Sequence, residues 1–501
     1  MEENKREEQD TREFAIYGVA SIIYAVVFVF CLYKNFSGIT SPIWAGATVY
    51  YMYYIYKKVS AKWNTINTFC GTVIVLLGIS NFITGNVDII CLNYLAIFAI
   101  IIVNVMYIFV NTKGVNVTRH FCAIVQLLFG TLGEIPAPVR QLKCGVKQYK
   151  SKKNEKVIYA IIGIAIAVPL MGIMIALLAS ADQVFKEVFR DIGELLNLDN
   201  IVPNVIGIAV MAVVGYIAPY AVFVYGNKKE VSPKTDKSGR NEPIIAIIVS
   251  GAISIIYILF SVIQVVYLFA GAGTLPEGYT YAEYAREGFF QLLFVSAFNL
   301  VMILVCIEFF KDSKVLDVIL TIISLCTFIM IASSAYRMGM YIDEYGLTFT
   351  RVFVLWALAV ITLVMAGLIF QLYKKEFNLF KYSLVVASIC YLALSFSHID
   401  YFIAKYDLDM YSRMEEHQIS DESDYNYEYV DYHYILNLSS DAAPAVEEHS
   451  EEIINYIENL EWGEVYSDWA YVYDKDYKQE KSRFSIRKFN ISEYIADNIQ
   501  P

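Results

Sequence analysis

The sequence contains no motif that holds nucleotide phosphates or a catalytic zinc ion. It has no GxxxxGK[ST] loop, so it is not an ATP-driven pump in a single chain. No two of its five histidines stand at helical metal-binding spacing with a glutamate between them, which argues against a zinc hydrolase. We therefore expect no metal, no cofactor and no catalytic residue that a motif identifies. Whether the chain is an enzyme stays open, with a non-catalytic role favoured.

Cysteine is also sparse, and none of the eight cysteines forms a CxxC pair of the kind seen in zinc and redox sites. Six of them lie in apolar runs, while Cys122 and Cys144 share one basic loop. We expect them to be buried as small apolar side chains. No cysteine follows Cys390, so the C-terminal part cannot contain a disulfide.

Charged side chains make up only 18% of the residues, whereas soluble domains usually carry about 25%. Apolar residues gather instead in blocks of about 20, the length at which a helix crosses about 30 Å of hydrocarbon. The sequence therefore predicts an all-α polytopic membrane protein with about eleven transmembrane helices, embedded in a lipid bilayer. The predicted spans are 14–33, 39–56, 66–84, 87–110, 157–179, 201–225, 243–271, 288–310, 314–338, 350–373 and 379–398.

Charge is distributed unevenly along the chain. From Ile399 onward there are 24 acidic and 8 basic residues, whereas the preceding part has a basic excess. An acidic C-terminal part argues against nucleic acid or anionic lipid as the partner of that part, because both require a basic surface.

Basic residues also predict the orientation, because short cytoplasmic loops retain Lys and Arg. With the N-terminus inside, the inner segments hold 25 basic residues and the outer segments hold six. Eleven spans then place the C-terminus outside. We expect cytoplasmic residues 1–13, four spans in 14–110, a basic cytoplasmic loop at 111–156, seven spans in 157–398 and a small acidic extracytoplasmic domain, mainly α, at 399–501.

Two loops contain amphipathic segments too short to span. Within 111–156, a half-apolar stretch interrupted by Pro136 and Pro138 is expected to lie on the inner membrane surface. Residues 181–198 carry an apolar stripe at helical spacing and are expected to lie flat on the outer surface. In the C-terminal part, 439–460 is expected to be helical, whereas composition leaves the order of 412–432 open.

Charged and polar residues gather at the predicted outer ends of four spans. Arg337, Tyr341 and Glu344 are spaced i, i+4, i+7, so a helix that continues beyond the bilayer places them on one face. We expect a cluster centred on Arg337, because nearby carboxylates would satisfy arginines otherwise isolated beside hydrocarbon. The candidates are Arg286, Glu287, Arg337, Tyr341, Asp343, Glu344, Arg351, His398, Asp400 and Lys405. They form either ion pairs that lock helix ends together, or a site for a polar ligand or for docking of the C-terminal part.

Other polar residues have simpler expected roles. Asn104, Gln264, Gln291 and Asn299 lie near mid-span and are expected to hydrogen-bond neighbouring helices. Asp407 and Asp409 form a DxD, which can hold a divalent ion but also arises by chance in acidic segments.

Five phrases resemble a known family. They are YAREGFFQL (284–292), YRMGMYIDEYGLTFTRV (336–352), SADQVF (180–185), YFIAKYDLDMY (401–411) and YILNLSSDAAPAV (434–446). Together they are similar to bacterial membrane proteins of the domain-of-unknown-function 4173 type, with the related 4153 group, from about residue 150 to the end. The resemblance implies a multi-spanning protein of a bacterial cell membrane. It implies no activity, cofactor or catalytic residue.

Three functions remain open from the sequence. A non-catalytic transport or cell-envelope-associated role, in which the outer cluster meets a polar or lipid-linked small ligand or an envelope protein, is favoured. A membrane glycosyltransferase-like enzyme acting on a lipid-linked substrate is the alternative, with Asp343, Glu344 or Asp407 as its acid; the first outer loop, from Lys34 to about Thr40, contains no acid and argues against it. An envelope sensor or scaffold, with the acidic C-terminal part as its contact surface, is the third.

Overall fold

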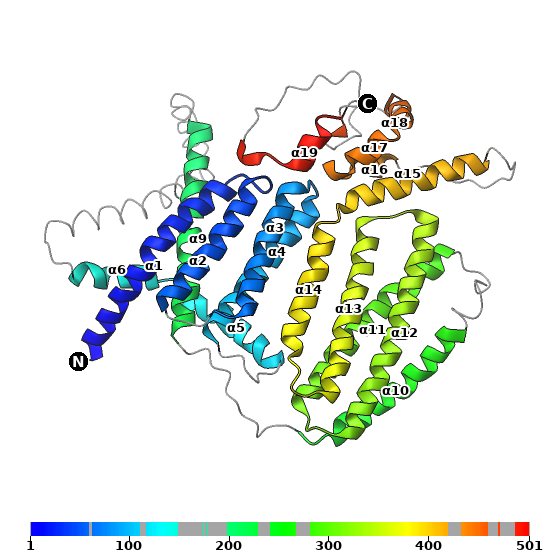
Figure 1. The fold of residues 1–501 in the computed structure, drawn as a ribbon, viewed down its shortest axis with the longest axis horizontal. Helices are drawn as coiled ribbons and strands as arrows, with labels where there is room; N and C mark the ends of the chain where they lie inside the picture. The colour runs from blue at the N-terminus through cyan, green and yellow to red at the C-terminus, as the bar shows by residue number, and fades with distance from the viewer. Residues whose placement is uncertain are drawn as a thin grey trace.

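Helices form almost the whole of the part of the computed structural model that is described (Figure 1). The described residues are 86% helical and contain no strand. They are 2–59, 63–110, 117–148, 174, 178, 198–228, 241–266, 281–418, 432–458, 469–470 and 486–499. The helices before the C-terminal part are α1 (Glu2–Leu32), α2 (Thr40–Val59), α3 (Thr65–Ile83), α4 (Val87–Phe109), α5 (Val117–Gly133), α6 (Ala137–Gln148), α9 (Leu198–Asn227), α10 (Ile244–Gln264), α11 (Tyr281–Phe309), α12 (Lys314–Tyr345), α13 (Phe349–Tyr373) and α14 (Leu379–Ser395).

The C-terminal part contains shorter elements: α15 (Ile399–Gln418), α16 (Tyr432–Leu436), η2 (Ser440–Ala442), α17 (Ala443–Glu447), α18 (Ser450–Glu458), η4 (Ile486–Lys488) and α19 (Ile491–Ala496). Figure 1 shows α15 to α19 gathered at one end of the long helices, opposite the end at which α1 begins. The loops between α3 and α4 and between α12 and α13 lie at this same end.

In the described part of the chain, eight helices are long and apolar enough to cross a membrane. They correspond to eight of the eleven predicted spans, which makes this an integral membrane protein. The predicted span 39–56 forms α2, which is long enough but not apolar enough to count among the eight. Of the predicted span 157–179, only residues 174 and 178 are described. The last predicted span forms α14, after which the chain bends by 56° into α15.

Helix α12 continues beyond the length that hydrocarbon requires. Its 32 residues extend about 48 Å at 1.5 Å per residue, against about 30 Å of hydrocarbon. The helix ends at Gly346, whose φ of 74° lies in the region that favours glycine, and whose N–H donates to Ile342 O. As expected, the charged residues up to Glu344 therefore stand on continuous helix at the end of a span.

Polar side chains within the bundle bond between helices, as expected for uncharged groups in hydrocarbon. Asn67 Nδ2 donates to Asn104 Oδ1 at 2.6 Å, and Ser333 Oγ donates to Gln264 Oε1 at 2.6 Å. Asn299 accepts from Tyr257 and donates to Thr327. These contacts fix the register of α3 with α4 and of α12 with α10 and α11.

Burial bears on two expectations drawn from the sequence: that the cysteines are buried, and that the segment within 111–156 lies on the membrane surface. Four cysteines are buried, but Cys91 and Cys122 are exposed, because they lie on outward helix faces. Helix α5 buries His120, Ala123 and Leu127 and contacts α4, α9 and α14, so one of its faces is packed. The predicted outer helix at 181–198 lies outside the described residues except for Leu198, which begins α9.

The C-terminal elements share one hydrophobic core with the ends of the long helices. Ile403, Leu436 and Val446 belong to the same buried cluster as Ile89 of α4 and Leu394 of α14. The described residues after Ile399 are thus packed directly onto the membrane helices.

Candidate functional site at the loop ends of the helices

The structure divides the predicted outer cluster into two groups. Arg337, Tyr341, Asp343, Glu344 and Arg351 stand around the α12–α13 turn, whereas His398, Asp400 and Lys405 stand at the start of α15. Arg286 and Glu287 belong to α11, which packs against α12, but their side chains lie outside the described part. No described contact joins Asp400 to the turn group, so the second group requires its own description.

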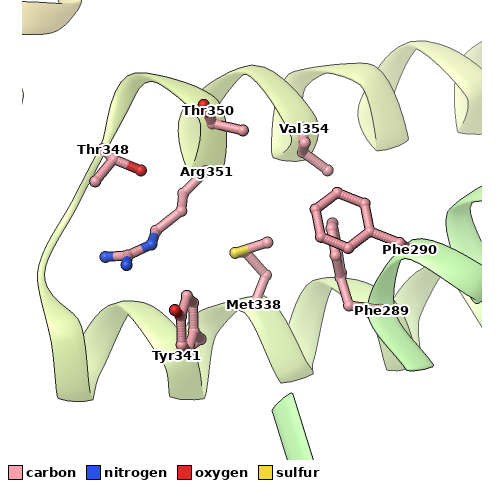
Figure 2. Close-up of a pocket in the computed structure, with 8 residues that line it drawn as sticks. All are labelled: Phe289, Phe290, Met338, Tyr341, Thr348, Thr350, Arg351 and Val354. Atoms are coloured by element: carbon pink, nitrogen blue, oxygen red, sulfur yellow. The ribbon is translucent and has the colours of Figure 1, made fainter. Parts of the chain in front are cut away.

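A pocket of about 180 Å³ lies at the α12–α13 turn. Figure 2 shows the guanidinium of Arg351 near Thr348 and Tyr341 at one end, and Phe289 and Phe290 at the other. Its lining residues are Phe289, Phe290, Met338, Tyr341, Thr348, Thr350, Arg351 and Val354.

Arg351 is held in place by the end of α12. Its Nη1 donates to Tyr345 O at 2.7 Å and also to Gly346 O. Its Cζ lies 4.4 Å from the ring centroid of Tyr341, within the range of a cation–π contact. A cation at a helix C-terminus complements the helix dipole, so these contacts also stabilise the turn.

The neighbouring candidates have different surroundings. Arg337 is buried, at 8% exposure, and directly precedes Met338 of the pocket. Asp343 is exposed and accepts a 3.3 Å hydrogen bond from Tyr406 of α15, while Glu344 is exposed. The side chain of Lys405 is 41% exposed and lies 3.4 Å from Glu448, so this ion pair contributes little stability.

The second group contains two buried carboxylates. Asp400 Oδ2 accepts from Asn86 Nδ2 at 2.8 Å, from Ser439 N at 3.1 Å and from Ser439 Oγ at 2.5 Å. Asn86 is also the N-cap of α4, where its Oδ1 accepts from Ile89 N. One carboxylate thus joins the start of α15, the start of α4 and the segment before η2.

Asp441 forms the matching contact with the α3–α4 loop. Its Oδ1 accepts from Gly85 N at 2.9 Å, and its Oδ2 accepts from Thr84 Oγ1 at 2.5 Å. His398 Nδ1 lies 3.4 Å from the same Oδ2. A Cβ on Gly85 would approach Ser440 Oγ to 2.0 Å, so a larger residue at this position would displace the Ser440 hydroxyl.

The pKa values follow from these contacts. Burial raises the pKa of Asp441, but hydrogen bonds from His398, Ser492, Thr84 and the Gly85 amide outweigh it, and the net shift is downward. The hydrogen bond to Asp441 raises the pKa of His398, against the opposing effect of burial. Near neutral pH, Asp441 is therefore ionised and favours the protonated imidazole.

We call Asp400, Asp441, His398 and Asn86 the carboxylate clasp. His398 has a φ of 48°, a left-handed conformation that histidine adopts more readily than most side chains. This residue turns the chain between α14 and α15, which lies with the C-terminal elements outside the spans. The clasp therefore fixes that turn onto the α3–α4 loop.

The DxD residues serve the structure separately. Asp407 is 3% exposed, and its Oδ1 accepts from Leu347 N at 2.6 Å, which stabilises the α12–α13 turn. Asp409 lies 3.9 Å from His449. The described residues contain no group of three potential metal-ligating side chains.

Sequence reasoning selected Asp400 and His398 but missed Asp441, Asn86 and Thr84. Asp441 lies within the resembling phrase YILNLSSDAAPAV, which was the available signal. Asn86 is separated from Asp400 by more than 300 residues, and nothing in the local sequence relates the two.

Comparison with known proteins gives one family. The family model described as "Domain of unknown function (DUF4153)" matches residues 71–449, about three quarters of the chain. No curated protein matches. No solved structure matches either. The match supports the related 4153 group named above; it starts earlier than the expected residue 150 and stops before the end, and the 4173 type is not shown.

Proposed function

The chain belongs to the DUF4153 family, and from this premise we propose that it is a non-catalytic membrane protein that binds a small ligand at the α12–α13 turn. The role is transport across the cell membrane or association with the cell envelope. Binding is favoured over catalysis because the two most buried acids of the region, Asp400 and Asp407, are both engaged by backbone amides.

One observation carries this proposal: Arg351 stands in a pocket without a carboxylate partner among the described residues. Long arginine side chains near helix ends extend their charged group to the membrane interface. Here the carbonyl contacts use only Nη1, and the rest of the guanidinium remains available to a ligand.

Mass spectrometry of the intact protein purified in mild detergent tests the proposal. We expect the wild type to retain a small molecule and Val354→Phe, which fills the pocket, to lose it. Val318→Phe is the matched control, because Val318 is 52% exposed on α12 and does not line the pocket. Equal retention by both variants, or none by the wild type, contradicts a ligand site at this turn.

The enzyme alternative predicts a different result in the same preparation. A glycosyltransferase-like enzyme would consume a lipid-linked sugar, and turnover would stop in Asp343→Asn or Glu344→Gln. A sensor or scaffold would instead retain an envelope protein through its acidic C-terminal surface. Either outcome replaces the binding role.

We further propose that the N-terminus is cytoplasmic and the C-terminal elements are extracytoplasmic in a bacterial cell membrane. The excess of basic residues in the inner loops supports this orientation. A phosphatase reporter fused to the C-terminus should be active, and a fluorescent protein at the N-terminus should fluoresce. An inactive phosphatase beside a well-expressed fusion reverses the orientation.

A further inference from the structure

The pocket at the α12–α13 turn is polar at one end and apolar at the other. The guanidinium of Arg351 and the hydroxyl of Thr348 form the polar end, and Phe289 with Phe290 forms the apolar end (Figure 2). A ligand that satisfies both ends must itself be amphipathic.

The polar end favours an anion. A guanidinium has five N–H donors, and the two carbonyl contacts of Arg351 both use Nη1, which leaves the Nε–H and Nη2 donors. The adjacent start of α13 has no acidic residue in its first turn, and Thr348 forms no side-chain cap there. The positive end of the helix dipole therefore adds to the charge of Arg351.

The apolar end opens towards the bilayer. Phe289 begins a candidate membrane span, and the side chain of Phe290 is 56% exposed. Val354 lies within the span formed by α13. Arg351 belongs to the first turn of this same span, so the apolar end of the pocket lies deeper in the span than the guanidinium, which stands near its edge.

The size of the pocket limits what it encloses. Its volume is about 180 Å³, below the roughly 300–1,000 Å³ of sites that enclose a drug-sized molecule. A larger ligand can place only its head group and the adjoining part of its chain there. The remainder would extend past Phe290 into the lipid.

We propose that the ligand of the proposed binding function is an anionic membrane amphiphile, with a phosphate or carboxylate head group on Arg351 and the start of its chain against Phe289, Phe290 and Val354. A planar guanidinium with free donors suits an oxyanion, which accepts two parallel hydrogen bonds. A free inorganic anion would gain the same charge contact but would leave the apolar end unfilled. This inference depends on the existence of the site, and it adds the chemical class of the ligand.

Titration of the full-length protein in detergent with phosphatidic acid, phosphatidylcholine and inorganic phosphate tests the inference, with bound molecules counted by native mass spectrometry. We expect phosphatidic acid to bind at least about tenfold more tightly than phosphatidylcholine, which corresponds to about 1.4 kcal/mol. Arg351→Gln should abolish this preference, and Arg351→Lys should retain part of it. Val354→Phe should weaken the binding of both lipids while Val318→Phe leaves it unchanged.

The outcomes separate the two proposals. If both lipids bind with equal affinity and Val354→Phe still loses them, the proposal of an anionic head group is wrong, whereas the proposal of a binding site stands. Displacement of phosphatidic acid by an equal concentration of inorganic phosphate overturns the amphiphile in favour of a simple anion. Lipid binding that is identical in the wild type and Val354→Phe overturns both the ligand class and the site. Val354→Phe keeps Arg351, so it tests the site even if the Arg351 variants do not fold.

Discussion

Replacement of Asp441 by alanine should detach the α3–α4 loop from the C-terminal elements. The Asp441 side chain is fully buried and accepts from Gly85 N and Thr84 Oγ1, with His398 beside it. Alanine leaves the Gly85 amide and the Thr84 hydroxyl without their acceptor, and each buried unsatisfied donor costs about 1–3 kcal/mol. We expect the free energy of opening this contact to fall by about 3–5 kcal/mol, the range for breaking a buried ionic contact.

Hydrogen exchange of the wild type and the variant in detergent measures this change at the Gly85 amide. A loss of about 3–5 kcal/mol accelerates exchange by about two to four orders of magnitude, unless global unfolding becomes limiting first. Asp409→Ala is the matched control on the same surface, because its side chain is 45% exposed and its contact with His449 is long, at 3.9 Å. Its expected effect is about 0–1 kcal/mol.

Asp441→Asn provides an intermediate case. The amide keeps one carbonyl for Gly85 but removes the charge that favours protonated His398, so its cost should fall between those of the two alanine variants. If Asp441→Ala exchanges at the wild-type rate near Gly85, or no faster than Asp409→Ala, the buried carboxylate does not hold this loop and the reasoning is wrong.

Two further predictions concern backbone conformation and pH. Gly346→Ala should destabilise the protein by about 1–3 kcal/mol in denaturant unfolding, because the φ of Gly346 is 74° and a Cβ would lie 2.6 Å from Asp407 Oδ1. Gly339→Ala is the control: nothing lies within 4 Å of its Cβ position, so this variant should be neutral or more stable by about 0.5–1 kcal/mol. Equal effects of the two substitutions would show that the turn does not require glycine. The raised pKa of His398 contributes stability that is fully present below pH 6.5 and is lost as the pH rises through the pKa of His398 in the folded protein. The lowered pKa of Asp441 contributes stability that is present above pH 3.8 and is lost as the pH falls through the pKa of Asp441 in the folded protein. His398→Asn, which tolerates the same backbone conformation, should therefore flatten the decline in stability above pH 6.5, and an unchanged pH profile would remove His398 as its cause.

The sequence predicts the membrane helices well because their signal is local. A run of about 20 apolar residues fixes a span without reference to the rest of the chain, and eight predicted spans coincide with apolar helices. The span predicted at 39–56 shows the limit: its five tyrosines lower the apolar character, and the segment forms α2, which is not apolar enough to count among the eight.

The clasp lies beyond what local patterns can predict. The position of Asp400 at a span end predicts that it belongs to the cluster around Arg337. In the structure its carboxylate instead contacts Asn86 and Ser439. Pairing by charge favoured arginine as its partner. Buried carboxylates are satisfied equally well by amides and hydroxyls, and only the three-dimensional arrangement shows which donors lie within reach.

Helix α15 relates the clasp to the pocket. Asp400 and Asp407 are seven residues apart, so they lie on one face of α15, the face that also buries Ile403 and Leu408. Asp400 accepts from Ser439 and Asn86 beside the α3–α4 loop, and Asp407 accepts from Leu347 in the α12–α13 turn.

One rigid helix thus fastens two loops from distant parts of the chain. Leu347 lies between Gly346, whose carbonyl receives Arg351, and Thr348 of the pocket. The carboxylate of Asp407 therefore fixes the backbone that positions the guanidinium, and this part of the pocket is formed before a ligand arrives. Such preorganisation reduces the conformational cost of binding. The acidic face of α15 supports the basic pocket through the backbone, and among its described side chains none forms an ion pair that would neutralise Arg351.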